Sequence, residues 1–126
     1  MFRSILLSSL VFSSLYASSL HGGNFYIDTF CNRFEGKKNY TLSDGSRVGC
    51  YTASHVIEIK NAYNWTTALG QTLYNSLITK KKGGVVLIME HPDRDRSHLN
   101  KLIKIAKQHR VYVWVIYANG NIQGIH

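Results

Sequence analysis

One uninterrupted apolar run lies between two segments whose apolar residues recur at helical spacing. The run, residues 85–89, reads Val-Val-Leu-Ile-Met and has no polar position. A strand without a polar face has to be covered on both sides, as the inner strands of parallel sheets are. The segments around it, residues 65–79 and 99–106, show the i, i+3, i+4 rhythm of helices that provide such a cover. The chain is therefore expected to be an α/β protein.

Shorter segments complete the expected order of elements. Residues 24–34 predict a first helix, and residues 111–116 predict a last strand. Three further strands are expected at residues 39–42, 47–52 and 55–60. Tight turns at Asp44-Gly45 and Ala53-Ser54 join them into an antiparallel meander. The predicted order is α-β-β-β-α-β-α-β, with a mixed sheet flanked by helices and right-handed crossovers.

The first nineteen residues have the features of a secretory signal. Arg3 gives a short basic start, residues 4–16 form an apolar run, and the small residues Ala17-Ser18-Ser19 follow. Thirteen residues are too few to span about 30 Å of hydrocarbon comfortably as a helix, so cleavage is expected. We predict a signal peptide at 1–19 and a single secreted or periplasmic domain at 20–126, with no membrane span after cleavage.

The charge of the chain is strongly positive. Fifteen Lys and Arg against seven Asp and Glu give +8, and without Arg3 the remainder carries 14 − 7 = +7. Such a balance favours a polyanion, either nucleic acid or an anionic membrane surface. Phosphate contact by some of the lysines in residues 80–107 fits nucleic acid, the expected partner. Because a run of charge is usually a solvated face, no single lysine is assigned a site.

Two cysteines, Cys31 and Cys50, remain in the predicted mature chain. An even count in an oxidising compartment makes a disulfide reasonable, and two buried free thiols explain the pattern equally well. If the first helix lays its apolar face on the sheet, Cys31 approaches Cys50. A bridge then requires Cα atoms within about 7 Å.

The third expected strand carries a carboxylate and an ammonium group on one face. Glu58 and Lys60 are two residues apart, and side chains alternate along a strand. In a phosphodiesterase such a carboxylate holds Mg²⁺, and the lysine positions water or stabilises developing charge. A solvated pair on an edge strand has the same pattern, so the triplet alone is weak.

The wider pattern resembles the PD-(D/E)xK nuclease superfamily, also called restriction-endonuclease-like. The segments that carry the resemblance are D-G-S-R-V-G-C at 44–50, I-E-I-K at 57–60, W-x-x-A-L-G-Q-T-L-Y at 65–74 and G-V-V-L-I at 84–88. The resemblance implies an α-β-β-β-α-β fold and hydrolysis of nucleic acid that depends on Mg²⁺ or Mn²⁺. It implies Glu58, Lys60 and Gln71 as catalytic residues, with Glu58 as the metal ligand.

Two acids of the family pattern are missing here. Gly49 stands where these relatives carry an aspartate, and Asn39 replaces an acid expected before the tyrosine of the preceding strand. Glu35 is a conceivable substitute, although we interpret it as a solvated helix end. One hypothesis is thus an exported nuclease-like protein with an impaired site. The alternative is a catalytically inactive nuclease-fold domain that binds nucleic acid or a protein partner.

Three other features have simpler interpretations. Residues 91–98 hold two histidines and two aspartates, and we interpret them as a solvated loop leading into a helix capped by Ser97 or Asp95, rather than as a metal site. The helix residue Gln71 is also consistent with an ordinary surface glutamine. Trp65, Trp114 and the tyrosines are interpreted as core residues rather than as platforms for base stacking.

Overall fold

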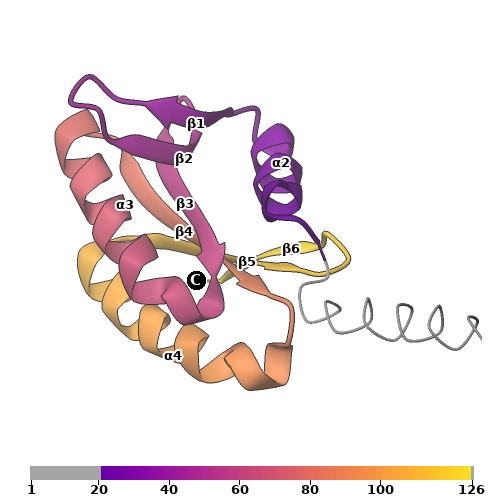
Figure 1. Cartoon of the computed structure of the whole chain (residues 1–126). Coiled ribbons are helices and arrows are strands. Elements are labelled where there is room, and N and C mark those ends of the chain that lie inside the picture. The colour runs from indigo at the N-terminus through magenta and orange to yellow at the C-terminus, as the bar shows by residue number, and fades with distance from the viewer. Residues whose placement is uncertain (1–20, 126) are drawn as a thin grey trace, which may run out of the picture.

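The apolar run predicted as a covered strand is strand β4, Lys82–Met89, and every residue after Lys82 is buried. The computed structural model describes residues 21–125, so the predicted signal peptide lies outside the described residues. The other elements, in chain order, are α2 (Gly23–Arg33), β1 (Lys37–Thr41), β2 (Arg47–Tyr51), β3 (His55–Asn61), the short 3-10 helix η2 (Ala62–Asn64), α3 (Trp65–Thr79), α4 (Pro92–His109), β5 (Tyr112–Tyr117) and β6 (Ile122–Ile125). The fold is α/β, as predicted (Figure 1).

The six strands form one mixed, open sheet in the order β1-β2-β3-β4-β5-β6. Strand β2 runs antiparallel to β1 and β3, while β3, β4 and β5 are mutually parallel and β6 is antiparallel to β5. Helices α3 and α4 provide the two crossovers between the parallel strands. The predicted antiparallel pairing of the second and third strands and the crossover from residue 65 to β4 are both confirmed.

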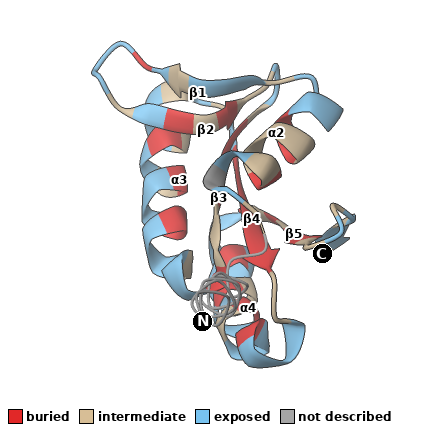
Figure 2. Ribbon diagram, turned by 45° about the vertical axis from the view of Figure 1, so that its right-hand side comes forward, coloured by how far each residue is buried: buried red, intermediate tan, exposed pale blue. Residues whose placement is uncertain are grey.

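Helices cover both faces of the sheet. Helix α2 packs on one face through Tyr26 and Phe30, and α3 and α4 pack on the other through residues such as Leu69 and Leu102. Figure 2 shows the buried residues following the strands and the inward sides of the helices. Within residues 21–125, no helix combines the length and the apolar character needed to cross a membrane.

Two sequence predictions about element boundaries are wrong. The chain does not end in β5, because a hairpin at Asn119-Gly120, with Gly120 at φ 88°, returns it as β6. Helix α4 begins at Pro92 rather than near Ser97. Proline is favoured in the first helical turn because its missing N–H has no helical partner there. The side chain of Asp95 then accepts a hydrogen bond from the His91 N–H at 3.3 Å instead of capping a later start.

A disulfide joins Cys31 of α2 to Cys50 of β2, with a Cα–Cα distance of 5.6 Å. This settles the two alternatives in favour of the bridge. Gly36 packs directly against the bridge: a Cβ atom there would lie 2.8 Å from the sulfur of Cys31 and closer still to that of Cys50. The link from α2 to β1 can therefore cross the bridge only because residue 36 has no side chain.

Candidate functional site

Glu58 lies in the middle of β3, on the face of the sheet that α3 covers, and is 5% exposed. One of its carboxylate oxygens, Oε2, accepts hydrogen bonds from the Gly49 N–H at 3.2 Å and from Asn75 Nδ2 at 3.3 Å. Asn75 is itself buried in α3 and also donates to the Arg47 carbonyl. Glu58 is thus held by internal donors instead of lining an open cleft.

Strand pairing explains why Gly49 faces this carboxylate. Cys50 pairs with Ile57, and antiparallel pairing therefore brings the preceding Gly49 beside Glu58. A Cβ atom at Gly49 would lie 3.2 Å from the Ile57 carbonyl oxygen and 3.7 Å from the Glu58 Cα. An aspartate at this position would need β2 and β3 to move apart by a few tenths of an ångström.

The surroundings of Glu58 act on its pKa in opposite directions. Burial raises the pKa above its ordinary value, since desolvation disfavours the charged carboxylate. The hydrogen bonds from Gly49 and Asn75 and the positive charge of Lys60 offset part of that increase. The internal donors and Lys60 thus favour the charged form of a carboxyl group that burial disfavours.

The three residues predicted to be catalytic do not meet in one cleft. Lys60 is half-buried and lines a pocket at the carboxyl end of β3. Gln71 is exposed and lines a groove between α3 and the turn of the β1–β2 hairpin. The helix residue that reaches Glu58 is Asn75, which the sequence reasoning missed. It lies one turn, about 6 Å, further along α3.

Among residues 21–125, no additional carboxylate joins Glu58 in a metal site. Glu35 lines a groove on the other face of the sheet, beside Ile57 and Trp114. Asp44 stays in its turn, where it accepts hydrogen bonds from the Ser46 hydroxyl, the Tyr74 hydroxyl and the Ser46 N–H, and these lower its pKa to about 2. Within the described part of the chain, no three His, Cys, Asp or Glu side chains are grouped as metal ligands. Mg²⁺ is usually bound by one or two carboxylates together with waters and substrate phosphates, whereas Glu58 is 5% exposed and receives internal hydrogen bonds from Gly49 and Asn75.

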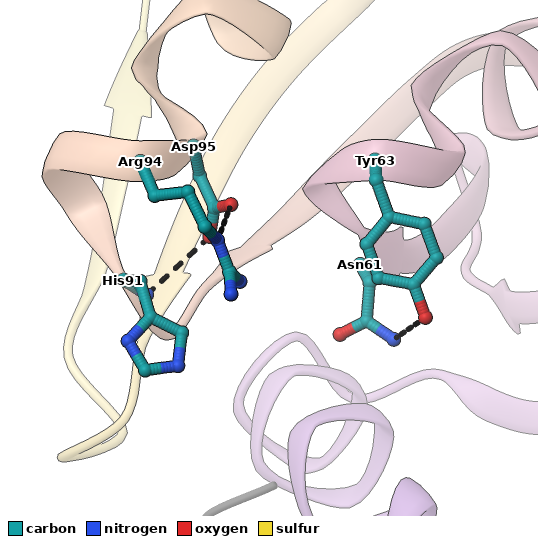
Figure 3. Close-up of polar contacts among 5 residues, drawn as sticks. All are labelled: Asn61, Tyr63, His91, Arg94 and Asp95. Carbon is teal, nitrogen blue, oxygen red and sulfur yellow. Dashed lines mark hydrogen bonds and ion pairs between the residues drawn. The ribbon is translucent and has the colours of Figure 1, made fainter. Parts of the chain in front are cut away.

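A polar crevice lies beyond the carboxyl ends of β3 and β4, the usual place for ligands in open α/β sheets. Two pockets of about 180 and 270 Å³ adjoin there and share Asn61, Ile88 and Glu90. Figure 3 shows Asn61 at the end of β3, Tyr63 in η2, and His91, Arg94 and Asp95 around the start of α4.

The polar groups of this crevice are largely paired with one another. Tyr26 donates its hydroxyl hydrogen to Glu90 at 2.7 Å, and Arg94 Nε donates to Asp95 at 3.0 Å. The Asn61 amide donates to the Tyr63 hydroxyl at 3.4 Å. The sequence did not reveal this crevice, because residues 91–98 read as a solvated loop, whereas Arg94 and Asp95 lie in α4 and line the crevice. The expected parallel strands do carry a signal, since ligands of open α/β sheets usually bind beyond the carboxyl ends of such strands.

Basic residues collect at the opposite end of the parallel strands. The α3–β4 and α4–β5 connections, with the exposed cations Lys80 and Arg110, lie at the amino ends of β4 and β5, and exposed Lys82 is the first residue of β4. The Lys81 ammonium lies 4.0 Å from the centre of the Tyr51 ring, and that of Lys82 lies 5.8 Å from the Tyr112 ring. This end of the sheet therefore combines cations with aromatic rings.

The aromatic residues are not all in the core, contrary to the sequence interpretation. Trp65 is partly buried and packs against the core of the α3–α4 face. Tyr63 is 61% exposed, and Tyr74 is 48% exposed. Trp114 is half-buried and lines a groove on the α2 face.

Comparison of the chain with protein-family models, with curated proteins and with solved structures found no match in any of the three.

Proposed function

We propose that this chain is a nucleic-acid-binding domain with a restriction-endonuclease-like scaffold, in which Glu58 has a structural role instead of holding a catalytic metal. The observation that carries the proposal is that the Gly49 N–H and the Asn75 amide both donate to the buried Glu58 carboxylate. A second carboxylate that shared a metal with Glu58 would be expected at residue 49. That residue is a glycine, and its N–H donates one of the two hydrogen bonds to Glu58.

The element order supports the scaffold part of the proposal. The chain has a helix, three antiparallel strands, a helix and a parallel strand in succession, which agrees with the α-β-β-β-α-β order that the resemblance implies. Glu58 and Lys60 occupy the E-x-K positions on the third strand. The predicted leader and the disulfide are consistent with export, which stays a prediction.

The distribution of charge supports nucleic acid as the partner. Ion pairs at about 3 Å hold Lys38 with Asp28 and Arg94 with Asp95. The exposed side chains of Lys80, Lys82 and Arg110 lie at the opposite end of the sheet from Arg94. Cations grouped in this way bind phosphates and release counterions, and affinity then falls steeply with salt.

Fluorescence anisotropy with labelled oligonucleotides in EDTA tests the proposal. Binding is expected at about 50 mM salt and should weaken strongly by about 200 mM. The Lys80→Glu, Lys82→Glu double variant should weaken binding and reduce the slope of log affinity against log salt by about two. The matched control is Lys101→Glu, Lys104→Glu, which changes the net charge equally on the exposed side of α4 and should have a smaller effect.

Cleavage assays distinguish the binding proposal from the nuclease hypothesis. Oligonucleotides incubated with the protein and Mg²⁺ or Mn²⁺ should remain intact. Metal-dependent cleavage that disappears in Glu58→Gln would contradict the proposal and restore Glu58 as a catalytic ligand. If both lysine double variants lose the same amount of affinity, binding depends on the net charge of the protein and not on the position of Lys80 and Lys82.

A further inference from the structure

A groove of about 240 Å³ lies on the α2 face of the sheet, near the amino end of β3. Its aromatic lining comes from three separate elements: Phe34 at the end of α2, His55 at the start of β3 and Trp114 in β5. Ordinary small-molecule sites have volumes of about 300–1,000 Å³, so this groove is smaller than such a site. The groove therefore suits one planar ring better than a large ligand.

The Phe34 wall of the groove is held in place from behind. The Phe34 ring stacks on Phe30 with centroids 4.3 Å apart and contacts Trp114 edge-on at 5.7 Å. The disulfide from Cys31, three residues earlier, ties the end of α2 to β2. Even so, 38% of Phe34 is exposed, so part of its ring is available to a ligand.

The opposite wall is the turn between β2 and β3, and it is held just as firmly. The Lys81 ammonium donates hydrogen bonds to the carbonyls of Thr52 at 2.7 Å and Ala53 at 3.1 Å. The Thr52 hydroxyl oxygen accepts from the N–H groups of Ser54 at 3.3 Å and His55 at 2.9 Å. A groove with two fixed walls loses little conformational entropy when a ligand enters.

Charged groups stand at the edge of this groove. Lys82 pairs with the groove-lining His55 in the register of β3 and β4, so its exposed ammonium lies one strand away. Tyr112, whose ring lies 5.8 Å from that ammonium, stacks beside Trp114. Glu35 also lines the groove and supplies a hydrogen-bond acceptor. A cation beside aromatic rings matches a ligand that carries a phosphate next to a planar ring.

We infer that this groove receives one base of a single-stranded nucleic acid, stacked on Phe34 and in edge contact with Trp114, while Lys82 contacts an adjacent phosphate. The inference rests on the proposed function and adds to it that the strand is single, because the bases of a duplex are stacked within the helix. A carboxylate is the partner of the cytosine amino group, so Glu35 favours a base that carries such a group.

Tryptophan fluorescence tests this inference directly in the mature, oxidised chain. The Trp65→Phe variant leaves Trp114 as the remaining tryptophan, because the chain has two. The probe is oligo(dC) of about twelve nucleotides, within the site sizes of about 4–16 known for single-strand binders. Heparin, which is a polyanion without bases, is the control. Oligo(dC) should quench Trp114, whereas heparin should bind with little quenching.

Substitution of the groove wall provides a second measurement. Phe34→Ala should weaken oligo(dC) binding about tenfold, in line with the loss of one base–aromatic contact, and leave heparin binding unchanged. Tyr63→Ala, which removes an aromatic ring that is 61% exposed on another part of the surface, should affect neither ligand. Thermal unfolding checks that each variant is folded. If Phe34→Ala does not fold, the quenching of Trp114 still tests the inference, because that measurement does not use this variant.

The outcomes separate this inference from the proposed function. If oligo(dC) binds without quenching Trp114 and Phe34→Ala binds it as well as wild type, the groove is not a base site, while the proposed function stands. If neither single-stranded nor duplex DNA binds at about 50 mM salt, the proposed function fails and the inference fails with it. Quenching together with a loss specific to Phe34→Ala supports both.

Discussion

Removing the Asn75 amide should destabilise the protein by an amount that depends on pH. Asn75→Ala removes two donated hydrogen bonds, one to the Glu58 carboxylate and one to the Arg47 carbonyl, both at 3.3 Å. Both acceptors stay in place, and Glu58 is 5% exposed, so water replaces the lost donor poorly. The effect should therefore reflect how strongly the buried charge of Glu58 depends on Asn75.

The expected loss of folding free energy in Asn75→Ala is the sum of the contributions of the two hydrogen bonds. A hydrogen bond to a charged group contributes about 1.5–3 kcal/mol and a neutral one about 0.5–1.5 kcal/mol. Because both bonds are long, the lower ends of these ranges apply, and the expected loss at pH 8 is about 2 kcal/mol. Once Glu58 is protonated, both bonds have neutral acceptors, and the expected loss falls to about 1 kcal/mol.

The direction of the pH effect follows from the raised pKa of Glu58. A carboxyl group whose pKa is higher in the folded protein binds its proton more tightly there. The cost of its buried charge is therefore fully present above the folded-state pKa, shrinks as the pH falls below that value, and is gone below the unfolded-state pKa. Asn75→Ala raises that pKa further, so the gap between variant and wild type should narrow from pH 8 towards pH 5.

Urea unfolding at both pH values measures the difference, with the slope m checked for constancy. Gln71→Ala, one turn earlier on the exposed side of α3, is the matched control and should change stability by less than about 0.5 kcal/mol. In a Glu58→Gln background the Asn75→Ala loss should no longer vary with pH. An equal loss at pH 8 and pH 5, with no change in that background, would refute the coupling of Asn75 to Glu58.

Two further predictions concern Gly49 and the disulfide. Gly49→Asp should destabilise the metal-free protein by about 2 kcal/mol, since its Cβ meets the Ile57 carbonyl at 3.2 Å. The second carboxylate should also strengthen Mn²⁺ binding relative to wild type, as measured by calorimetry. Identical, negligible Mn²⁺ binding by both proteins would show that a second carboxylate beside Glu58 is not enough to hold the metal. Replacing Cys31 and Cys50 together by serine should lower the free energy of unfolding by about 3 kcal/mol, measured by urea unfolding. A loss below about 1 kcal/mol would contradict the loop-entropy argument.

The candidate site was predictable in part. The sequence correctly placed Glu58 and Lys60 two residues apart within one strand, β3. Gln71 was predicted as the helix residue of the site. On a helix, each step of one residue turns the side-chain direction by about 100° and moves it about 1.5 Å along the axis. Which helix residue lies level with Glu58 depends on how α3 docks on the sheet. The docked helix brings Asn75 there instead.

The sequence alone determined the α/β class, the covered strand β4 and the crossover helices, because each follows from local periodicity within one segment. It also limited the disulfide to a single pair, Cys31 with Cys50. Tertiary structure decided whether that pair is bonded and that Glu58 is enclosed. It also brought Phe34, His55 and Trp114 together around one groove. These residues are far apart in the chain, and their contacts depend on the packing of α2 against the sheet, which no local pattern encodes.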